Sequence, residues 1–445
     1  MIQTWRKTSS ELIYSPNVIK DIHMKTIDGY DVKIFTDNIE DTAIEQIRQL
    51  LSIDVFSDCK IRIMPDVHAG AGCVIGFTGN LGDKVIPNIV GVDIGCGMLV
   101  QPFICNNPID FHALNEYILR AIPSGRDFRD ENYLPLSQKY SDIYQNAKQL
   151  ILQLRCYREL KEVRRLYKSI GSLGGGNHFI ELDKDESGLY YLVVHTGSRN
   201  LGKQVADIYQ KLAVKCQSGW DKLMVEKNRI IEEYKQAGRK SELQEVIRNL
   251  HNSFKTCKLT IPQDLCYLQG QFREDYLHDM HICQCWAQIN RKLIVNLIMD
   301  FIVGKGVVSS EEHFRPFESV HNYIGNDNII RKGAISARLG EKCIIPLNMR
   351  DGSLICIGKG NEDWNFSAPH GAGRIMSRSQ AFKEISLEDF KKSMEDVYSE
   401  TVTEYTKDES PMVYKSKHEI MDNINDTVDI ENVIKPVFNF KAADL

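Results

Sequence analysis

The spread of reactive side chains along the sequence limits the folds that this chain can adopt. Five of its twelve histidines stand near Gly or Asn at the ends of apolar segments: His68, His178, His195, His321 and His370. Positions so far apart can share one site only if a single fold brings the whole chain together. The 445 residues contain no internal repeat and no low-complexity linker, so we expect residues 1–445 to form one α/β (α+β) domain.

The first candidate site is the glycine-rich stretch Val90-Gly-Val-Asp93-Ile-Gly-Cys96-Gly97. Asp93 and Cys96 put a carboxylate and a thiol within reach of one cation, and the glycines let the backbone bend around it. In a reducing compartment such a pair indicates a metal site or a nucleophile more than a disulfide. For these eight residues alone, a turn with a buried cysteine is the more common explanation.

Imidazoles, a thiolate and a carboxylate together form a mixed nitrogen, sulfur and oxygen donor set. A closed structural zinc site normally takes its ligands from tight local pairs, and the twelve cysteines include no CxxC pair. An open catalytic site with one or two metals suits the dispersed spacing, and a thiolate can bridge two cations roughly 4 Å apart. Both kinds of site stay open on this reasoning.

Three glycine-rich loops, at 171–176, 351–353 and 371–373, offer backbone N–H groups to phosphate, although none matches a Walker A or dinucleotide fingerprint. Basic side chains accompany them: Arg331, Lys332, Arg374, Arg378 and Lys441. His370 follows Pro369 and precedes Gly371, which suits an imidazole nucleophile that holds phosphorus as a phosphoramidate. A metal ligand or a phosphate donor is the alternative role for His370.

Charge and hydropathy exclude several classes of protein. The net charge of −5 indicates no general affinity for nucleic acid, so a basic site must be local, such as the run from Arg155 to Lys168. A solvated helix face is the usual reason for such a run. Residues Met1–Lys7 carry no secretory signal, and the most apolar run, Leu293–Val303, is too short to cross a bilayer. We therefore expect a cytoplasmic protein with no membrane partner.

Hydrophobic periodicity predicts helices over 110–122, 142–167 and 275–303, and strands over 29–36, 61–64, 189–194 and 433–445. Thr42 and Glu45 have the spacing of a capping box. Residues 203–256 are predicted to form a charged helical hairpin that leaves the core and bends at Ala237-Gly238.

Seven motifs resemble, in order and over nearly the whole chain, those of the RtcB family of RNA-splicing ligases: Asp66-Val-His68, Gly91-Val-Asp93-Ile-Gly-Cys96-Gly, Gly174-Gly-Gly-Asn177-His178-Phe-Ile-Glu181, His195-Thr-Gly-Ser-Arg, His321-Asn322, Arg331-Lys-Gly-Ala and His370-Gly-Ala-Gly-Arg374. The resemblance implies one domain of the RtcB type, with mixed sheets around a dinuclear metal centre. It implies an enzyme that uses two Mn²⁺ ions and GTP to join RNA 2′,3′-cyclic phosphate or 3′-phosphate ends to 5′-hydroxyl ends, in RNA splicing or repair. An archease-like protein is a candidate activating partner.

The resemblance also implies a role for individual residues. One Mn²⁺ would be held by Asp93, Cys96 and His178, and the second by Cys96, His195 and His321, with Cys96 as the bridge. His370 would be the residue that becomes guanylylated. The implied nucleotide pocket comprises Asn177, His178, Phe179, Ile180, Glu181, His321, Asn322, Pro346, Asn348, Met349, Ser353, His370, Gly371, Ala372, Gly373 and Lys441. The implied RNA or phosphate contacts are Asp66, His68, Arg164, Arg165, Arg331, Lys332, Arg374 and Arg378.

The implied reaction has three steps. Metal-activated water opens the cyclic phosphate, His370 passes GMP from GTP to the RNA 3′-phosphate, and the 5′-hydroxyl then displaces GMP. An alternative enzyme would guanylylate nucleic-acid 3′-phosphates and cap the ends with little sealing. The chain departs from the family pattern at one point: many members carry Pro-Gly-Ser-Met-Gly-Thr where this chain has Pro346-Leu-Asn-Met-Arg-Asp-Gly-Ser353. Arg350 and Asp351 are new charges there.

Overall fold

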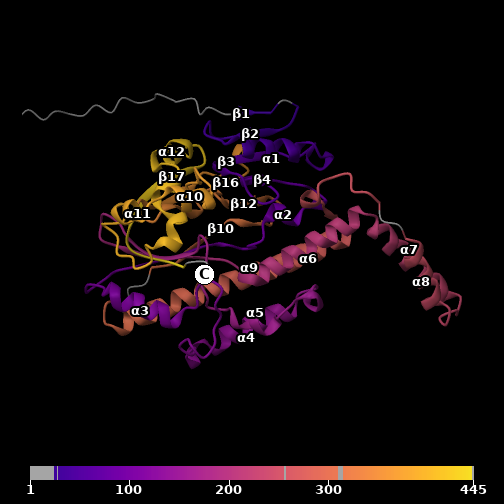
Figure 1. The fold of residues 1–445 in the computed structure, drawn as a ribbon, viewed down its shortest axis with the longest axis horizontal. Helices are drawn as coiled ribbons and strands as arrows, with labels where there is room; N and C mark the ends of the chain where they lie inside the picture. Colours follow the sequence, from indigo (N-terminus) through magenta and orange to yellow (C-terminus); the bar gives the residue numbers. More distant parts are fainter. Residues whose placement is uncertain (1–24, 28, 255–256, 309–313, 443–445) are drawn as a thin grey trace, which may run out of the picture.

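Two β-sheets of different topology form the centre of the structure, and a long helix packs along one of them (Figure 1). The computed structural model describes residues 25–27, 29–254, 257–308 and 314–442. Met1–Lys7, where the sequence predicts no secretory signal, lies outside these residues. Helices and strands alternate through the described chain, as expected for a mixed α/β fold.

The larger sheet has antiparallel strands in the order β10-β6-β8-β7-β17-β15-β14. Their bounds are β10 Phe317–Val320, β6 Gly97–Phe103, β8 Tyr190–Thr196, β7 Phe179–Lys184, β17 Val428–Lys441, β15 Gly352–Gly358 and β14 Lys342–Asn348. The edge strands β10 and β14 approach each other, and Ile344 N donates to Ser319 Oγ at 3.0 Å. The sheet therefore curls around an interior that contains Met98, Val193 and Ile355.

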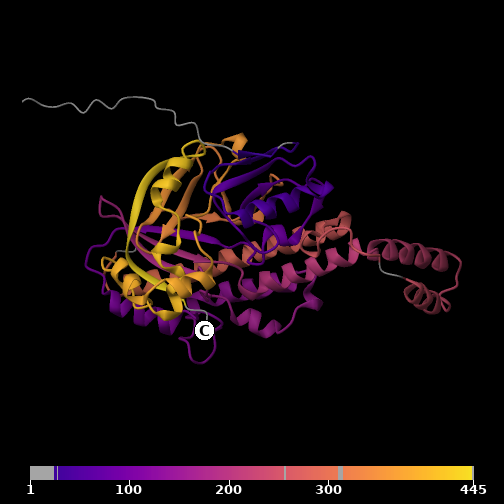
Figure 2. The same cartoon turned by 45° about the horizontal axis from the view of Figure 1, so that its top comes forward.

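The long strand β17 joins the two halves of this sheet (Figure 2). Its first half pairs with β15, and its second half, ending at Lys441, pairs with β7. The predicted strand at 433–445 therefore begins five residues earlier than expected, at Val428, while residues 443–445 lie outside the described part.

The smaller sheet has the order β1-β2-β3-β4-β12-β11. Its strands are β1 Lys25–Thr26, β2 Val32–Ile34, β3 Ile61–His68, β4 Ile75–Gly79, β12 Ile330–Lys332 and β11 Asn322–Ile324. The predicted end of a strand at Pro65 is wrong, because β3 continues through Pro65 to His68. Two short pairs complete the strands: β13 Ala334–Ser336 with β16 Ser367–Pro369, and β5 Lys84–Val85 with β9 Leu268–Gln269.

The helix α9, Gly270–Gly304, contains the predicted helix at 275–303 and packs against β6 and β8. Trp286 lies fully buried in it. The other helices are α1 Asp41–Leu51, α2 Pro87–Val90, α3 Phe111–Ala121, α4 Ser141–Leu152, α5 Val163–Lys168, α6 Arg199–Gln217, α7 Trp220–Gln236, α8 Leu243–Ser253, α10 Arg378–Glu384, α11 Leu387–Ser393 and α12 Lys417–Asn423. The helix predicted over 142–167 is interrupted, since residues between α4 and α5 are not α-helical.

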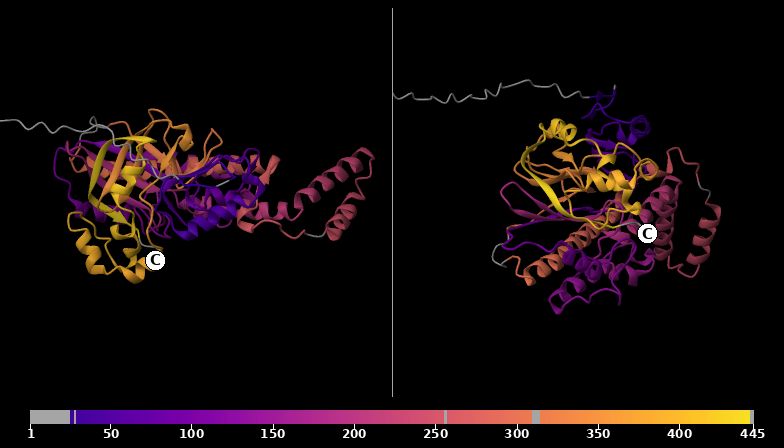
Figure 3. Two further views of the ribbon diagram at one scale, coloured as in Figure 1. Left: turned by 90° about the horizontal axis from the view of Figure 1, so that it is seen from above. Right: turned by 60° about the vertical axis from the view of Figure 1, so that its left-hand side comes forward.

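The segment 203–256 consists of two parts with different surroundings. Helix α6 packs against α9 and buries Val205, Tyr209 and Ala213, so its residues belong to the core. Helices α7 and α8 pair with each other and project from the rest of the chain, with the bend after Gln236 (Figure 3). The predicted excursion therefore begins at α7 rather than at residue 203.

Three further expectations can be compared with the structure. The predicted capping box is wrong, because α1 begins after Glu40 and no side chain caps its first turn. All twelve cysteines are free thiols, as the absence of paired spacings indicated. Among the described residues, no helix is long and apolar enough to cross a membrane.

Candidate active site

Four neighbouring strands bring the predicted metal ligands to one edge of the larger sheet. Because β10, β6, β8 and β7 are antiparallel neighbours, the ends of β10 and β8 meet the beginnings of β6 and β7. His321 directly follows β10, Cys96 directly precedes β6, His195 lies near the end of β8, and His178 directly precedes β7. Sheet topology thus gathers donors that are far apart in the sequence.

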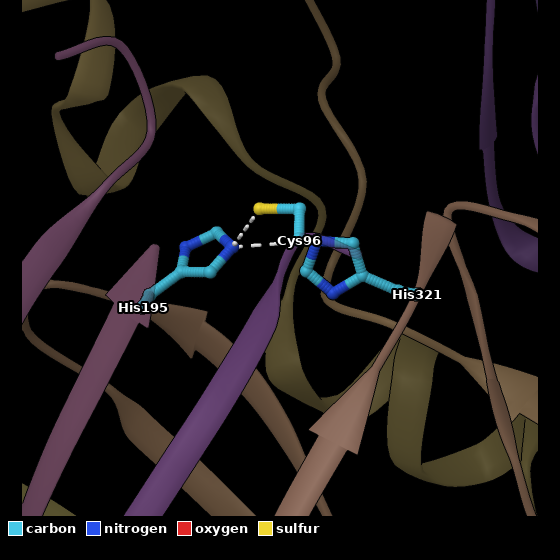
Figure 4. Close-up of side chains that lie close together, drawn as sticks. All are labelled: Cys96, His195 and His321. Atoms are coloured by element: carbon cyan, nitrogen blue, oxygen red, sulfur yellow. Dashed lines mark hydrogen bonds between the residues drawn. The ribbon is translucent and has the colours of Figure 1, made fainter. Parts of the chain in front are cut away.

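The donor atoms of these residues approach closely, and Figure 4 shows three of them, Cys96, His195 and His321. Cys96 Sγ lies 3.4 Å from His178 Nε2 and 3.3 Å from His195 Nε2, and the Nε2 atoms of His195 and His321 are 3.3 Å apart. Asp93 Oδ2 lies 3.0 Å from His178 Nε2. Two sets of three have all their ligand atoms within 4.8 Å: Cys96, His195 and His321, and Asp93, Cys96 and His178. Cys96 belongs to both.

The hydrogen bonding of this cluster suits a cation. A backbone carbonyl only accepts, so the 3.1 Å contact between His195 Nδ1 and Asn177 O places the ring hydrogen on Nδ1 and a lone pair on Nε2. Burial lowers the pKa of His195 and of His321 well below the usual value, so both rings are neutral. The buried Asp93 Oδ1 has no hydrogen-bond partner among the described residues. The neutral imidazole of His195 and the unpartnered oxygen of Asp93 offer lone pairs that a cation can accept.

The pKa values of Cys96 and Asp93 are both shifted by their surroundings. Burial and the negative charge of Asp93 raise the pKa of the Cys96 thiol well above its usual value. Burial opposes ionisation of Asp93 as well, but the hydrogen bond from His178 and the positive charge nearby together outweigh it, so the pKa of Asp93 is lowered. Cys96 would therefore lose its proton on binding a cation, which links metal affinity to pH.

Close packing holds the ligand loops in place. Arg291 on α9 is 1% exposed, and its Nη1 donates to Gly95 O and Thr196 O, each at 2.7 Å. It thereby ties the loop before β6 to the end of β8. A Cβ on Gly197 would overlap the carboxylate of Asp93, so only glycine lets the backbone approach this ligand.

His370 lies beside this cluster, directly after β16, and its ring centroid is 4.8 Å from that of His321. Asp66 on β3 accepts two hydrogen bonds with one oxygen: Oδ2 lies 2.6 Å from His370 Nδ1 and 3.1 Å from His370 N. Asp66 is fully buried. The carboxylate therefore holds the hydrogen on Nδ1 and leaves Nε2 with a lone pair.

A pocket of about 710 Å³ adjoins both His195 and His370. The predicted nucleotide residues that line it are Asn177, Phe179, Glu181, Pro346, Asn348, Met349, His370, Gly371, Ala372, Gly373 and Lys441. Lys441 Nζ donates to Asn177 O at 3.1 Å and pairs with Glu409 at 2.7 Å. Burial raises the pKa of Glu181 to about 7, although the hydrogen bond from Asn439 works in the opposite direction.

Five residues predicted for the nucleotide pocket do not line it. Ile180 is on the opposite face of β7 from Phe179 and packs in the main core, because side chains alternate along a strand. Ser353 is fully buried and does not line the pocket. Asn322 binds Asp93 O at 3.3 Å and Gly333 N at 3.0 Å, so it supports the metal-ligand loop. His178 and His321 belong to the donor cluster and not to the pocket lining.

The departure from the family pattern at 346–353 forms a self-contained turn. Arg350 pairs with Asp351 at 3.1 Å, so the two new charges compensate each other. Asn348 Oδ1 accepts from both of their backbone N–H groups, and its Nδ2 donates to Asp351 at 2.8 Å. The Asn348 amide is thus engaged within the turn that forms one wall of the pocket.

Several predicted RNA or phosphate contacts have structural partners instead. Asp66 positions His370. Arg331 is 1% exposed and binds Asp327, Ser367 and backbone carbonyls. Lys332 donates to the carbonyls of Ala71, Cys73 and Asn88 at 2.6–3.2 Å. Neither buried side chain is placed to contact RNA at the surface.

The remaining predicted contacts are more accessible. His68, Arg374 and Arg378 line the pocket, and both arginines pair with Glu409. Arg164 and Arg165 are exposed on α5, away from the pocket lining.

Sequence reasoning missed Asn439, Glu409 and Arg291. Asn439 stands two residues before Lys441 on β17, so strand alternation places both on one face and could have identified it. Glu409 and Arg291 carry no such local signal, because their partners come from distant segments.

Comparison with known proteins identifies the family of this chain. The family model described as tRNA-splicing ligase RtcB matches residues 46–442, a range that contains every donor and pocket residue named above. The chain belongs to the RtcB family. The family predicted from the motifs is therefore confirmed, as is a single mixed helix and sheet domain of this family.

Members of the RtcB family from bacteria and archaea match most of the chain. The RNA-splicing ligase RtcB of Escherichia coli K12 is 30% identical over 407 residues, which cover 86% of this chain and 90% of the relative. The tRNA-splicing ligase RtcB of Methanococcus maripaludis is 24% identical over 459 residues, covering 86% and 87%. RNA-splicing ligase RtcB1 of a second E. coli strain is 29% identical over 407 residues.

Proposed function

We propose that the protein is an RNA ligase that uses GTP and two Mn²⁺ ions to join RNA 3′-phosphate ends to 5′-hydroxyl ends. RtcB family membership supports ligase activity. The observation that carries the finer proposal is the shared pocket. One cavity adjoins His370, which the buried Asp66 orients, and also His195, which belongs to the cluster of metal donors. A substrate that ends in a 2′,3′-cyclic phosphate must first be hydrolysed to the 3′-phosphate.

His370 is the proposed nucleophile. Its Nε2 attacks the α-phosphorus of GTP, and the bond from that phosphorus to pyrophosphate breaks as the P–N bond forms. Asp66, which lies 2.6 Å from Nδ1, stabilises the positive charge that develops on the ring. The oriented Asp66–His370 pair is the feature that distinguishes this histidine from the metal donors.

Two displacements complete the reaction. An oxygen of the RNA 3′-phosphate attacks the same phosphorus, the P–N bond breaks, and His370 is regenerated. The 5′-hydroxyl of the second RNA then attacks the RNA phosphorus, and GMP leaves. Asp93, Cys96 and His178 would hold one cation and Cys96, His195 and His321 the other. Bound Mn²⁺ would supply positive charge that neutralises the phosphate oxygens.

The charges on the pocket wall favour guanine. Guanine presents two N–H donors next to a carbonyl acceptor, whereas adenine does not. Glu181 as a carboxylate accepts from N–H groups, and Lys441 can donate to a carbonyl oxygen. Asn439 Nδ2 holds Glu181 Oε2 at 2.6 Å, which fixes the carboxyl group at the wall. This pairing supports GTP over ATP as the nucleotide.

The test is intact-protein and peptide mass spectrometry after incubation with GTP and Mn²⁺. We expect one covalent GMP at His370, absent from His370→Ala and retained in His418→Ala, which removes an exposed histidine on α12. Absence of GMP from the unmodified protein, or its presence in His370→Ala, would refute the assignment. Product analysis with a labelled RNA that carries a 3′-phosphate then separates a joined strand from a guanylylated 3′-end, the product of a capping enzyme.

A further inference from the structure

A second pocket, of about 340 Å³, lies at the beginning of α4. Figure 1 shows the place of this helix in the fold. Two basic side chains, Arg129 and Lys168, line it together with Tyr140, Tyr144, Ser137 and Ser141. Tyr144 and Lys168 are half-buried, so both are accessible from solvent. Neither the metal donors nor the nucleotide pocket use any of these residues.

The charge of this part of the chain differs from that of the whole protein. Between Arg120 and Lys168 there are eleven Lys and Arg residues against six Asp and Glu, a net charge of +5, whereas the whole chain has −5. Carboxylates of α9 pair with two of these basic residues, Asp300 with Lys139 and Asp275 with Arg155, and the remaining excess of positive charge attracts a polyanion. Aromatic rings accompany the charges, since Arg165 and Lys168 both lie over the ring of Phe128, at 5.1 and 5.9 Å.

Arg129 offers an unused donor at this pocket. Its Nη1 and Nη2 donate to the carbonyls of Leu134 and Gly171, at 3.1 and 3.0 Å. Its Nε is buried without a hydrogen-bond partner among the described residues. Burial lowers the pKa of Arg129 to about 10, so the side chain stays charged at neutral pH. A buried unpaired N–H is costly unless a ligand accepts from it.

The backbone connects this pocket directly to the metal-ligand loop. Leu173 N donates to Pro123 O, Gly125 N donates to Gly174 O, and Arg129 N donates to Lys168 O, at 2.8–3.0 Å. The segment 123–129 therefore runs beside 171–174 and ends at α5. A Cβ on Gly174 would lie 2.6 Å from His178 Nδ1, so this loop packs against a metal donor. The segment that carries Arg129 is therefore hydrogen-bonded to the loop that packs against His178.

We propose that this pocket and its basic surroundings bind the single-stranded RNA substrate away from its reacting end, with Arg129 and Lys168 contacting phosphate and Tyr144 stacking on a base. Single-stranded nucleic acid is bound in this way by positive charge interleaved with aromatic rings. Duplex RNA would instead be contacted over a wide, shallow groove, which a small concave pocket does not fit. The proposal rests on the RNA ligase function proposed above and adds a second contact region for the same substrate.

The test is fluorescence anisotropy with a labelled 20-nucleotide RNA that carries a 3′-phosphate, titrated at several KCl concentrations. We expect Tyr144→Ala to weaken binding about tenfold, as for the loss of one stacked base. Lys168→Glu should also weaken binding, and should reduce the slope of log K against log[KCl] by about 0.7, the value for one phosphate contact on a single strand. The matched control is Lys222→Glu with Tyr234→Ala, both on α7, which should bind as the unmodified protein does.

Thermal unfolding of each variant establishes that it is folded before binding is compared. Affinities and salt slopes of Lys168→Glu and Tyr144→Ala that match those of the α7 control would overturn the proposal. Covalent GMP on the unmodified protein is measured in parallel. If GMP forms and the variants bind RNA normally, only this binding site is refuted. If no GMP forms at His370, the proposed ligase mechanism fails, whatever the RNA titrations show.

Discussion

Replacement of Asp66 by Asn should abolish most guanylylation while leaving the fold intact. The carboxylate lies 2.6 Å from His370 Nδ1 and also accepts from His370 N, so Asn keeps the shape but removes the charge. As Nε2 bonds to phosphorus, the ring becomes positive at about 4 Å from the centre of the carboxylate. At an effective dielectric constant of about 20 this attraction is about 4 kcal/mol. Its loss lowers the rate roughly 10³-fold.

A second effect acts in the same direction. If the Asn amide group presents its NH₂ to Nδ1, the ring hydrogen moves to Nε2 and the nucleophilic lone pair is lost. In a comparable carboxylate–imidazole pair this change costs about 10⁴ in rate. The expected range for Asp66→Asn is therefore about 10³ to 10⁴.

The assay is single-turnover transfer of GMP from labelled GTP to the protein, with manganese content and unfolding temperature measured on the same sample. Asp66→Asn should keep the metal content of the unmodified protein, because Asp66 is not a donor in either metal set. His418→Ala serves as the control for a distant substitution. A rate for Asp66→Asn within threefold of the unmodified protein, at equal metal content, would refute the positioning role of Asp66.

Three further outcomes are expected. By elemental analysis, Cys96→Ala should lose both Mn²⁺ ions, whereas His321→Ala should lose one, since only Cys96 belongs to both donor sets; equal loss would contradict the bridge. Burial raises the pKa of Glu181 to about 7, so the fraction of Glu181 that is a carboxylate rises from roughly a tenth at pH 6 to roughly nine-tenths at pH 8. Calorimetry should therefore show GTP affinity rising about tenfold over that range, and no such rise in Glu181→Gln. Lys332→Met leaves three buried carbonyls without a donor, so urea unfolding should show a loss of about 2–4 kcal/mol with an unchanged salt dependence of RNA binding.

The types of donor side chain in the candidate site were apparent from the sequence. A thiol, a carboxylate and imidazoles beside glycine keep their donor properties wherever the fold places them, so Cys96, Asp93 and His178 could be identified as candidate ligands. The mixed α/β fold and the long helix at 275–303 also follow from local patterns. Boundaries that depend on neighbours were less accurate: β3 passes through Pro65, and α6 belongs to the core because α9 covers it.

Tertiary structure decided which partner each polar group has. Arg331, Lys332 and Asp66 were predicted to contact RNA or phosphate because of the resemblance of their motifs to those of the RtcB family. Instead, each is buried, and a charged side chain is stable in the interior only when nearby donors or acceptors compensate for the loss of its hydration. Those partners, such as Asp327 for Arg331 and His370 for Asp66, come from other segments or from a local turn whose geometry the fold sets. Residue type therefore determined the chemistry that each side chain can perform. The packing of distant segments determined which partner each side chain contacts.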